Sequence, residues 1–230
     1  MPNTEKWQKK ERRARICLLI LSVIGWVAIF QFGFLQLHVI KYLAIFILLV
    51  LFLAVVENFP MPVWRGFTTI SFPIIYAIVV MQGIEYAVSA YAIVVFLGYL
   101  LKRRPLRIVF FNPAQLSLSL LIAFWCTNSF FSLFITDETS RMAIGILHFS
   151  FMIFPFYLVN NLVVDFILFV RPQPYTLASW KQKTFQELNS LVVSYIYLVL
   201  FIVLGNQNRG EIDVISFFFF FSPLVGLALL

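Results

Sequence analysis

Charged residues are scarce in this chain of 230 residues. Asp, Glu, Lys and Arg together make up 12% of it, whereas hydrophobic residues make up 62% and the mean hydropathy is +0.94. Soluble domains are about 45–50% apolar and about 25% charged, and so small a chain lacks the interior to bury this excess. The composition also excludes intrinsic disorder, which requires low hydrophobicity and high charge. It predicts an all-α, polytopic helix bundle in a cell membrane.

Residues that form disulfides and metal sites are also few. The two cysteines, Cys17 and Cys126, lie in separate apolar stretches, and the two histidines, His38 and His148, lie on different segments. This spacing fits neither a disulfide framework nor a zinc or haem site, so we expect no metal and no cofactor. The motifs G-x-S-x-G, H-E-x-x-H and Walker A do not occur. We therefore expect no enzymatic activity within these residues, although a fused downstream domain could carry one.

Long apolar runs fill most of the chain. A membrane-spanning helix needs about 20 apolar residues. Charged or turn-rich breaks divide residues 16–230 into eight candidate spans, and two prolines in the connection 57–66 end the second of them. Because the third span is short, residues 67–101 form either two spans or a re-entrant hairpin. The eight spans cover residues 16–37, 39–56, 67–82, 84–101, 108–135, 143–170, 191–205 and 214–230.

The basic residues predict the orientation of the bundle. Six Lys and Arg precede the first span, in a tail of residues 1–15. With this tail in the cytoplasm, fourteen of the 17 Lys and Arg fall on the cytoplasmic side, in agreement with the positive-inside rule. Eight spans then place both termini in the cytoplasm. The tail could bind nucleic acid, but orientation and attraction to anionic lipid explain it better. We expect the lipid bilayer, and no nucleic acid, as a partner.

The connection before the seventh span has its own pattern. Arg171-Pro-Gln-Pro174 is a stiff break, and Leu177, Trp180, Thr184 and Leu188 follow at helical spacing. This pattern predicts an amphipathic helix over 174–190 that lies in the cytoplasmic interface. The alternative is a plain cytoplasmic loop.

Six polar residues lie at membrane depth in two rows at helical spacing. At about 1.5 Å per residue, each row runs from roughly 7–9 Å to roughly 18–21 Å inside the cytoplasmic boundary. We therefore expect the rows to face each other in one polar seam. The fifth span carries Asn112, Gln115 and Ser119, and the sixth carries Tyr157, Asn161 and Asp165.

Three interpretations of this seam remain open. Its residues could form interhelical hydrogen bonds that fix the packing, or a ligand pocket or two-state switch, or an ion path. In the first case Asp165 would pair with Arg65 or Arg107, or would be protonated.

Several short motifs resemble a known family. They are Pro62-Val-Trp-Arg-Gly66, Ser71-Phe-Pro73, Arg104-Pro105 and Phe111-Asn112-Pro-Ala-Gln115-Leu-Ser117. Over about residues 57–120 the chain resembles the N-terminal multi-pass membrane regions, of MASE type, that precede GGDEF or HD-GYP domains in bacterial cyclic-di-GMP signalling proteins. The resemblance implies a sensory or anchoring role and supplies no catalytic residues. It also implies a homodimer, since cyclic-di-GMP synthesis generally requires paired catalytic domains.

Pattern and resemblance together predict a membrane sensory or anchoring domain. The last apolar segment runs to Leu230, which fits a helix that relays a signal to the protein's own or a fused cytoplasmic signalling domain. The alternative is a small-solute transporter or substrate-binding membrane subunit, against which stands the lack of inverted repeats. A third possibility is a structural membrane partner without a ligand.

Overall fold

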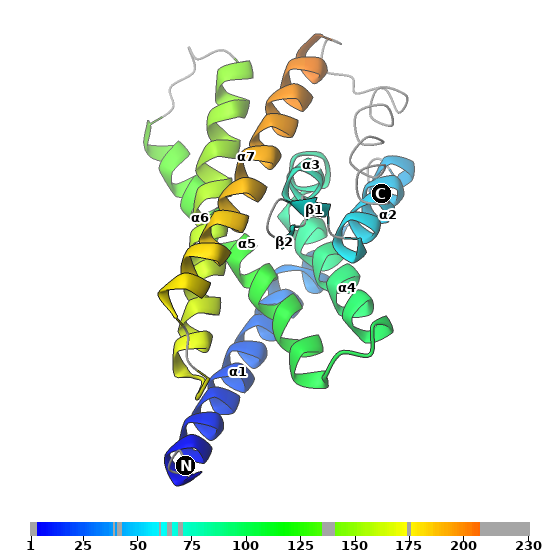
Figure 1. Ribbon diagram of the computed structural model, residues 1–230. Coiled ribbons are helices and arrows are strands. Elements are labelled where there is room, and N and C mark those ends of the chain that lie inside the picture. Colours follow the sequence, from blue (N-terminus) through cyan, green and yellow to red (C-terminus); the bar gives the residue numbers. More distant parts are fainter. Residues whose placement is uncertain are drawn as a thin grey trace.

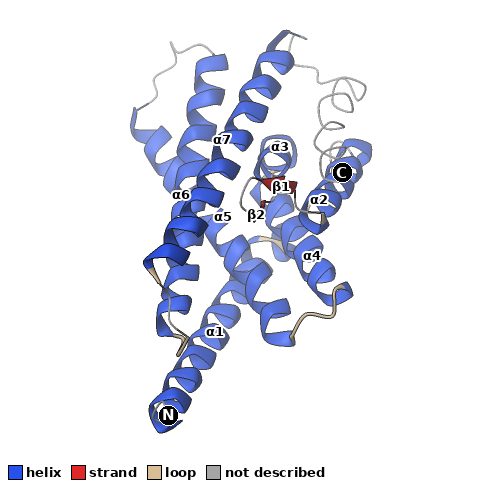
Figure 2. Cartoon of the chain, in the orientation of Figure 1, coloured by secondary structure: helices blue, strands red, loops and turns tan. Residues whose placement is uncertain are grey.

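Helices make up nearly all of the computed structural model (Figures 1 and 2). It describes residues 4–38, 40, 43–59, 61–63, 66–68, 71–134, 141–173 and 176–207. The helices are α1 (Thr4–Phe32), the 3-10 turn η1 (Phe34–Gln36), α2 (Leu43–Asn58), α3 (Phe72–Gln82), α4 (Ile84–Leu101), α5 (Leu106–Phe134), α6 (Arg141–Val170) and α7 (Leu177–Gln207). Two short antiparallel strands, β1 (Met61–Val63) and β2 (Gly66–Thr68), join α2 to α3, with Met61 opposite Thr68.

The helical fold is confirmed, and the long apolar helices are consistent with a membrane protein. Within the described residues, four helices are long and apolar enough to cross a bilayer, and α2 and α3 are shorter apolar helices. The number of eight spans remains a prediction, and the predicted eighth span lies outside the described residues. The four long apolar segments are Trp7–Gln36, Ile84–Leu101, Leu106–Ser132 and Leu147–Val170.

The predicted span 67–82 is wrong at its start, because β2 occupies 66–68 and α3 begins only at Phe72. At 1.5 Å per residue, the 11 residues of α3 extend about 16 Å, roughly half of the hydrocarbon core. The whole run from Phe72 to Val79 is buried, and α3 is seen end-on in Figure 1 while α6 and α7 run up the view. A single residue, Gly83 with φ of +114°, connects α3 to α4. Glycine permits this positive φ, so α3 and α4 form a tightly joined pair.

Two other boundaries differ from the predictions. The helix predicted over 174–190 and the span predicted over 191–205 form one continuous helix, α7. No proline or glycine interrupts residues 177–204, so nothing in the sequence ends the helix at residue 190. Ser190 itself is buried and hydrogen-bonds to Tyr157 of α6. Similarly, most of the predicted tail 1–15 belongs to α1, where Arg15 bonds to Glu11 one turn earlier.

The core is built around α3 and α4. Phe72 at the start of α3 is 1% exposed, and its ring centroid lies 5.4 Å from that of Phe149 and 4.8 Å from that of Phe156, both on α6. Leu49 and Leu53 of α2 close the core from the other side. By contrast, large apolar side chains such as Leu19 (66%) and Phe169 (80%) are exposed on the outside, as expected of a surface that faces lipid.

Basic segments gather at one end of the bundle. The start of α1, the α4–α5 connection and the α6–α7 connection all lie toward the bottom of Figure 1. The start of α1 contacts the start of α5. Glu11 Oε1 accepts a hydrogen bond from Arg15 Nε at 3.1 Å within α1, and it lies 3.6 Å from the Arg107 guanidinium of α5. The predicted cytoplasmic segments are therefore neighbours in the fold. That this end faces the cytoplasm remains a prediction from the positive-inside rule.

Candidate functional site

A polar cavity of about 550 Å³ lies where the ends of α2 and α4 meet the start of α5. It combines one carboxylate, two cations, two tyrosines and three side-chain amides in one space. Such a mixture is unusual beside apolar helices, because each buried polar group requires a partner. The polar residues of its wall are Glu57, Asn58, Tyr91, Tyr99, Lys102, Arg104, Asn112 and Gln115.

One face of α4 forms the longest wall of this cavity. Tyr91, Val95 and Tyr99 recur every four residues, and so do Val94, Gly98 and Lys102, which places both sets on one side of the helix. Gly98 allows α2 to come close, because a Cβ there would lie only 3.0 Å from the Asn58 side-chain nitrogen.

Asn58 and Lys102 tie the ends of α2 and α4 together. The Asn58 Nδ2 donates to the Ala54 carbonyl at 2.8 Å, and the Lys102 Nζ donates to the Asn58 carbonyl at 2.8 Å. Lys102 thereby neutralises the C-terminal end of α2, where unpaired carbonyls carry partial negative charge.

Glu57 supplies the acidic group of the cavity. Burial raises the pKa of its carboxyl, whereas hydrogen bonds with the Ser71 and Tyr91 side chains and the charge of Lys102 lower it. Its Oε1 atom is nevertheless buried and has no hydrogen-bond partner among the residues that the structure describes. Lys102 and Arg104, in contrast, are solvent-exposed. The cavity therefore offers a free acceptor inside and two cations at its exposed rim.

Two of the predicted site residues, Asn112 and Gln115, line this cavity. Asn112 hydrogen-bonds to the Tyr99 hydroxyl on α4. Gln115 is 5% exposed, and its Nε2 contacts the Asn160 side-chain oxygen and donates to the Asn160 carbonyl at 3.3 Å. Gln115 therefore joins the cavity to α6. Its partner is Asn160, which precedes the predicted Asn161.

The other four predicted residues do not line this cavity, so the six residues do not form a single seam there. Ser119 is buried, and its hydroxyl donates to the Gln115 carbonyl of its own helix at 2.9 Å. Tyr157, Asn161 and Asp165 turn to α7, where they meet Ser190, Glu187 and Lys183 respectively. The reason is that α7 continues as a helix along α6 and presents polar side chains to it.

The contact between Asp165 and α7 is a partly buried ion-pair cluster. Lys183 Nζ lies 2.6 Å from Asp165 Oδ1 and 3.8 Å from Glu187 Oε1, with all three side chains 19–28% exposed. Burial raises the pKa of the Glu187 carboxyl, whereas the charge of Lys183 lowers it. The predicted partners of Asp165 were Arg65 and Arg107. Arg107 lies beside Glu11 instead, and Arg65 lies outside the described residues. One lysine thus serves two carboxylates.

The sequence pattern did not single out Glu57, Tyr91, Tyr99 or Lys102 as site residues. Two signals were available in retrospect. Glu57 is an acidic residue at the very end of an apolar helix, and Tyr91, Tyr99 and Lys102 fall on one face of α4 at four-residue steps. Neither signal indicates that α2 and α4 end side by side, which depends on the packing of α3.

The described residues contain no group of three His, Cys, Asp or Glu that could hold a metal ion. No family model, no curated protein and no solved structure matches the chain. The polar side chains of the cavity can form hydrogen bonds and ion pairs with a small polar molecule.

Proposed function

We propose that this chain is the sensory or anchoring membrane domain of a bacterial signalling protein, and that the polar cavity receives its signal. The observation that carries the proposal is the free Glu57 oxygen inside a cavity whose rim holds Lys102 and Arg104. A small molecule with a hydrogen-bond donor at one end and an acidic group at the other would bond to the Glu57 oxygen and pair with Lys102 and Arg104. Buried polar groups without partners are costly, so such a ligand gains affinity by supplying them.

A continuous set of contacts supports the relay of this signal. Gln115 lines the cavity and bonds to Asn160 on α6, so a ligand that engages Gln115 competes with that bond. Helix α6 is in turn tied to α7 by Tyr157 with Ser190 and by Asp165 with Lys183. A ligand shifts a conformational equilibrium only by its differential affinity for the two states. Competition for Gln115 would provide that difference.

The family resemblance supports the same proposal. Three residues of its motifs line the cavity, namely Arg104, Asn112 and Gln115. A fourth, Ser71, hydrogen-bonds to Glu57 and Tyr91 in the cavity wall. Motif residues far apart in the sequence thus converge on one place. An output through cyclic-di-GMP is the part of the proposal that the resemblance supplies.

The test is made in the native host, with the chain in its natural gene. Gln115→Leu should change the cellular cyclic-di-GMP level, because it removes the amide shared by the cavity and α6. Ser119→Ala is the matched control, because Ser119 is buried one turn away and bonds only to its own helix in the described contacts. Membrane abundance of each variant is measured by immunoblot. An unchanged cyclic-di-GMP level at normal abundance would contradict the proposal.

Solute binding for transport is the second candidate function. The exposed cations Lys102 and Arg104 at the rim of the cavity could attract an anionic solute. This function predicts that Glu57→Gln abolishes the uptake of a solute while cyclic-di-GMP stays constant. Uptake assays with labelled amino acids and phosphorylated metabolites would distinguish the two functions.

A further inference from the structure

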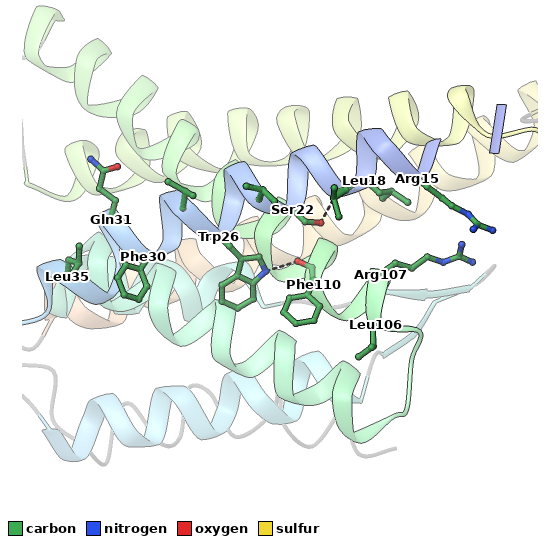
Figure 3. Close-up of a pocket in the computed structure, with 13 residues that line it drawn as sticks. Arg15, Leu18, Ser22, Trp26, Phe30, Gln31, Leu35, Leu106, Arg107 and Phe110 are labelled. Atoms are coloured by element: carbon green, nitrogen blue, oxygen red, sulfur yellow. Dashed lines mark hydrogen bonds between the residues drawn. The ribbon is translucent and has the colours of Figure 1, made fainter. Parts of the chain in front are cut away.

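A second, much larger hollow lies on the outside of the bundle, between α1 and the start of α5 (Figure 3). This α1–α5 groove encloses about 1280 Å³, more than the roughly 300–1,000 Å³ typical of pockets for drug-sized ligands. Its wall is mostly apolar, from Leu18, Leu19, Val23, Trp26, Val27, Phe30, Leu35, Leu106 and Phe110.

A close contact between α1 and α5 lies next to residues that line the groove. A Cβ at Gly25 would lie 2.6 Å from the Cβ of Ala114, so α1 and α5 touch at this point through small residues. Beside it the Trp26 indole donates to the Phe110 carbonyl at 2.9 Å, and the Ser22 hydroxyl donates to the Leu18 carbonyl at 2.7 Å. These polar atoms are already bonded. This part of the lining therefore suits a hydrocarbon chain rather than a polar molecule.

One end of the groove carries a pair of arginines. Arg15 of α1 and Arg107 of α5 lie together there, whereas Gln31 and Leu35 lie at the opposite end (Figure 3). Both guanidinium groups approach the same Glu11 oxygen, at 3.1 Å and 3.6 Å, and their side chains are 66% and 52% exposed. Two cations against one carboxylate leave a net positive charge. Each guanidinium has five N–H donors, more than Glu11 can accept, so donors remain for a phosphate.

The length of the groove matches a membrane. Arg15 lies seventeen positions before the end of α1 at Phe32, which corresponds to about 26 Å of helix, close to the roughly 30 Å of the hydrocarbon core, and Leu35 follows in η1. The arginine pair then lies at one membrane boundary, at the end of the bundle where the basic segments gather. An acyl chain that starts at this boundary runs along Leu18, Val23 and Trp26 into the bilayer.

We infer that the α1–α5 groove binds an anionic phospholipid, with its phosphate on Arg15 and Arg107 and an acyl chain along the apolar wall. The cationic end and the apolar wall match the two parts of such a lipid. A soluble anion would use only the arginines, and a helix of a second copy would need an acidic group at its end. The site shares no residue with the polar cavity, so it stands or fails independently of the proposed function.

The test uses Trp26 as a reporter inside the groove. The full chain is reconstituted in phosphatidylcholine vesicles that contain a minor fraction of phosphatidylglycerol, with brominated acyl chains on one lipid or the other. Bromine quenches tryptophan fluorescence at short range, and subtraction of the Trp26→Phe variant isolates the signal of Trp26. We expect quenching by brominated phosphatidylglycerol to exceed quenching by brominated phosphatidylcholine at equal mole fraction.

The arginine pair should account for this preference. Attraction to anionic lipid corresponds to about fivefold in affinity per basic residue, so Arg15→Gln with Arg107→Gln should abolish the preference. Lys9→Gln with Arg12→Gln is the matched control. It removes the same charge from exposed positions of α1 that do not line the groove, and should keep the preference. Circular dichroism verifies that all variants retain their helices.

Five outcomes would overturn the inference. The first three are equal quenching by both lipids, retention of the preference in the Arg15 and Arg107 variant, and equal loss of the preference in the control variant. The fourth is loss of all quenching together with cross-linked dimers, which would assign the groove to a second copy. The fifth is full competition by excess glycerol phosphate, which should compete only weakly; full competition would mean that a soluble anion, not a lipid, is the ligand.

Discussion

Gln115 on α5 bonds to Asn160 on α6 while the same Gln115 side chain lines the polar cavity. This double role makes the pair the junction between the cavity and the α6–α7 side of the bundle. It also explains why one buried glutamine is tolerated among apolar neighbours, since its amide is not left without a partner.

The side-chain part of this contact should be measurable as a coupling energy. In a double-mutant cycle of Gln115→Leu and Asn160→Leu, we expect a coupling of about 0.6 kcal/mol, the average for interhelical hydrogen bonds in membranes. Unfolding of the detergent-solubilised protein by increasing denaturing detergent gives the four stabilities. Ser119→Ala with Asn160→Leu serves as the reference pair and should show no coupling. Strictly additive effects of Gln115→Leu and Asn160→Leu would mean that the two side chains do not interact.

Gly98 allows Asn58 to lie against α4 in the wall of the polar cavity. A methyl group there would overlap the Asn58 side chain, so Gly98→Ala should destabilise the protein by about 1–3 kcal/mol, as overpacking does. Thermal unfolding followed by circular dichroism measures the loss. The double variant Gly98→Ala with Asn58→Ala removes the overlapping group and should regain most of the stability. Failure of this second change to restore stability would place the cause elsewhere.

The contact between Gly25 and Ala114 sets the distance between α1 and α5. A Cβ at Gly25 would lie 2.6 Å from both the Cβ and the carbonyl oxygen of Ala114, so Gly25→Ala should push the helices apart. We expect a loss of about 1–3 kcal/mol, measured by denaturing-detergent unfolding. Adding Ala114→Gly removes one of the two clashes and should restore part of that loss. A Gly25→Ala protein as stable as the parent would show that α1 can shift at no cost.

Sequence patterns predicted three of the five long helices well, and the contacts between helices only in part. The helices predicted over 84–101, 108–135 and 143–170 differ from α4, α5 and α6 by two residues or fewer at each end, because charges or prolines mark their limits. Asn112 and Gln115 were correctly placed on one face of α5. Spacing along a helix fixes such a face, whereas the partner of that face depends on the whole arrangement.

The partner of Asp165 shows where this approach fails. Depth matching predicted that Asp165, Asn161 and Tyr157 face α5, but depth is equal for every helix around the bundle. The real partners Lys183, Glu187 and Ser190 lie on α7, in a stretch predicted as a separate interfacial helix. Continuity of α7 brings them to α6. Nothing local in residues 174–190 distinguishes a helix that lies in the interface from the first turns of a longer one.

Lys183 should matter more to stability than either carboxylate that it serves. Asp165→Asn leaves Lys183 beside Glu187, so we expect a loss of about 1 kcal/mol. Lys183→Met leaves Asp165 and Glu187 as two like charges in a partly buried place and should cost about 1–3 kcal/mol. Unfolding in denaturing detergent compares the two variants. Lys181→Met on an exposed position of α7 is the control and should change little.

The pH dependence of Lys183→Met gives a sharper test of the same cluster. Without the lysine, burial and repulsion from Asp165 raise the pKa of the Glu187 carboxyl in the folded protein, and the charge of Lys183 no longer opposes them. The folded state then binds more protons, so stability should rise as the pH falls from about 8 to about 5. The parent protein, in which Lys183 stabilises the charged carboxylates, should gain less over the same range. If both proteins respond equally to pH, the carboxylates do not depend on Lys183, and the cluster makes no electrostatic contribution between α6 and α7.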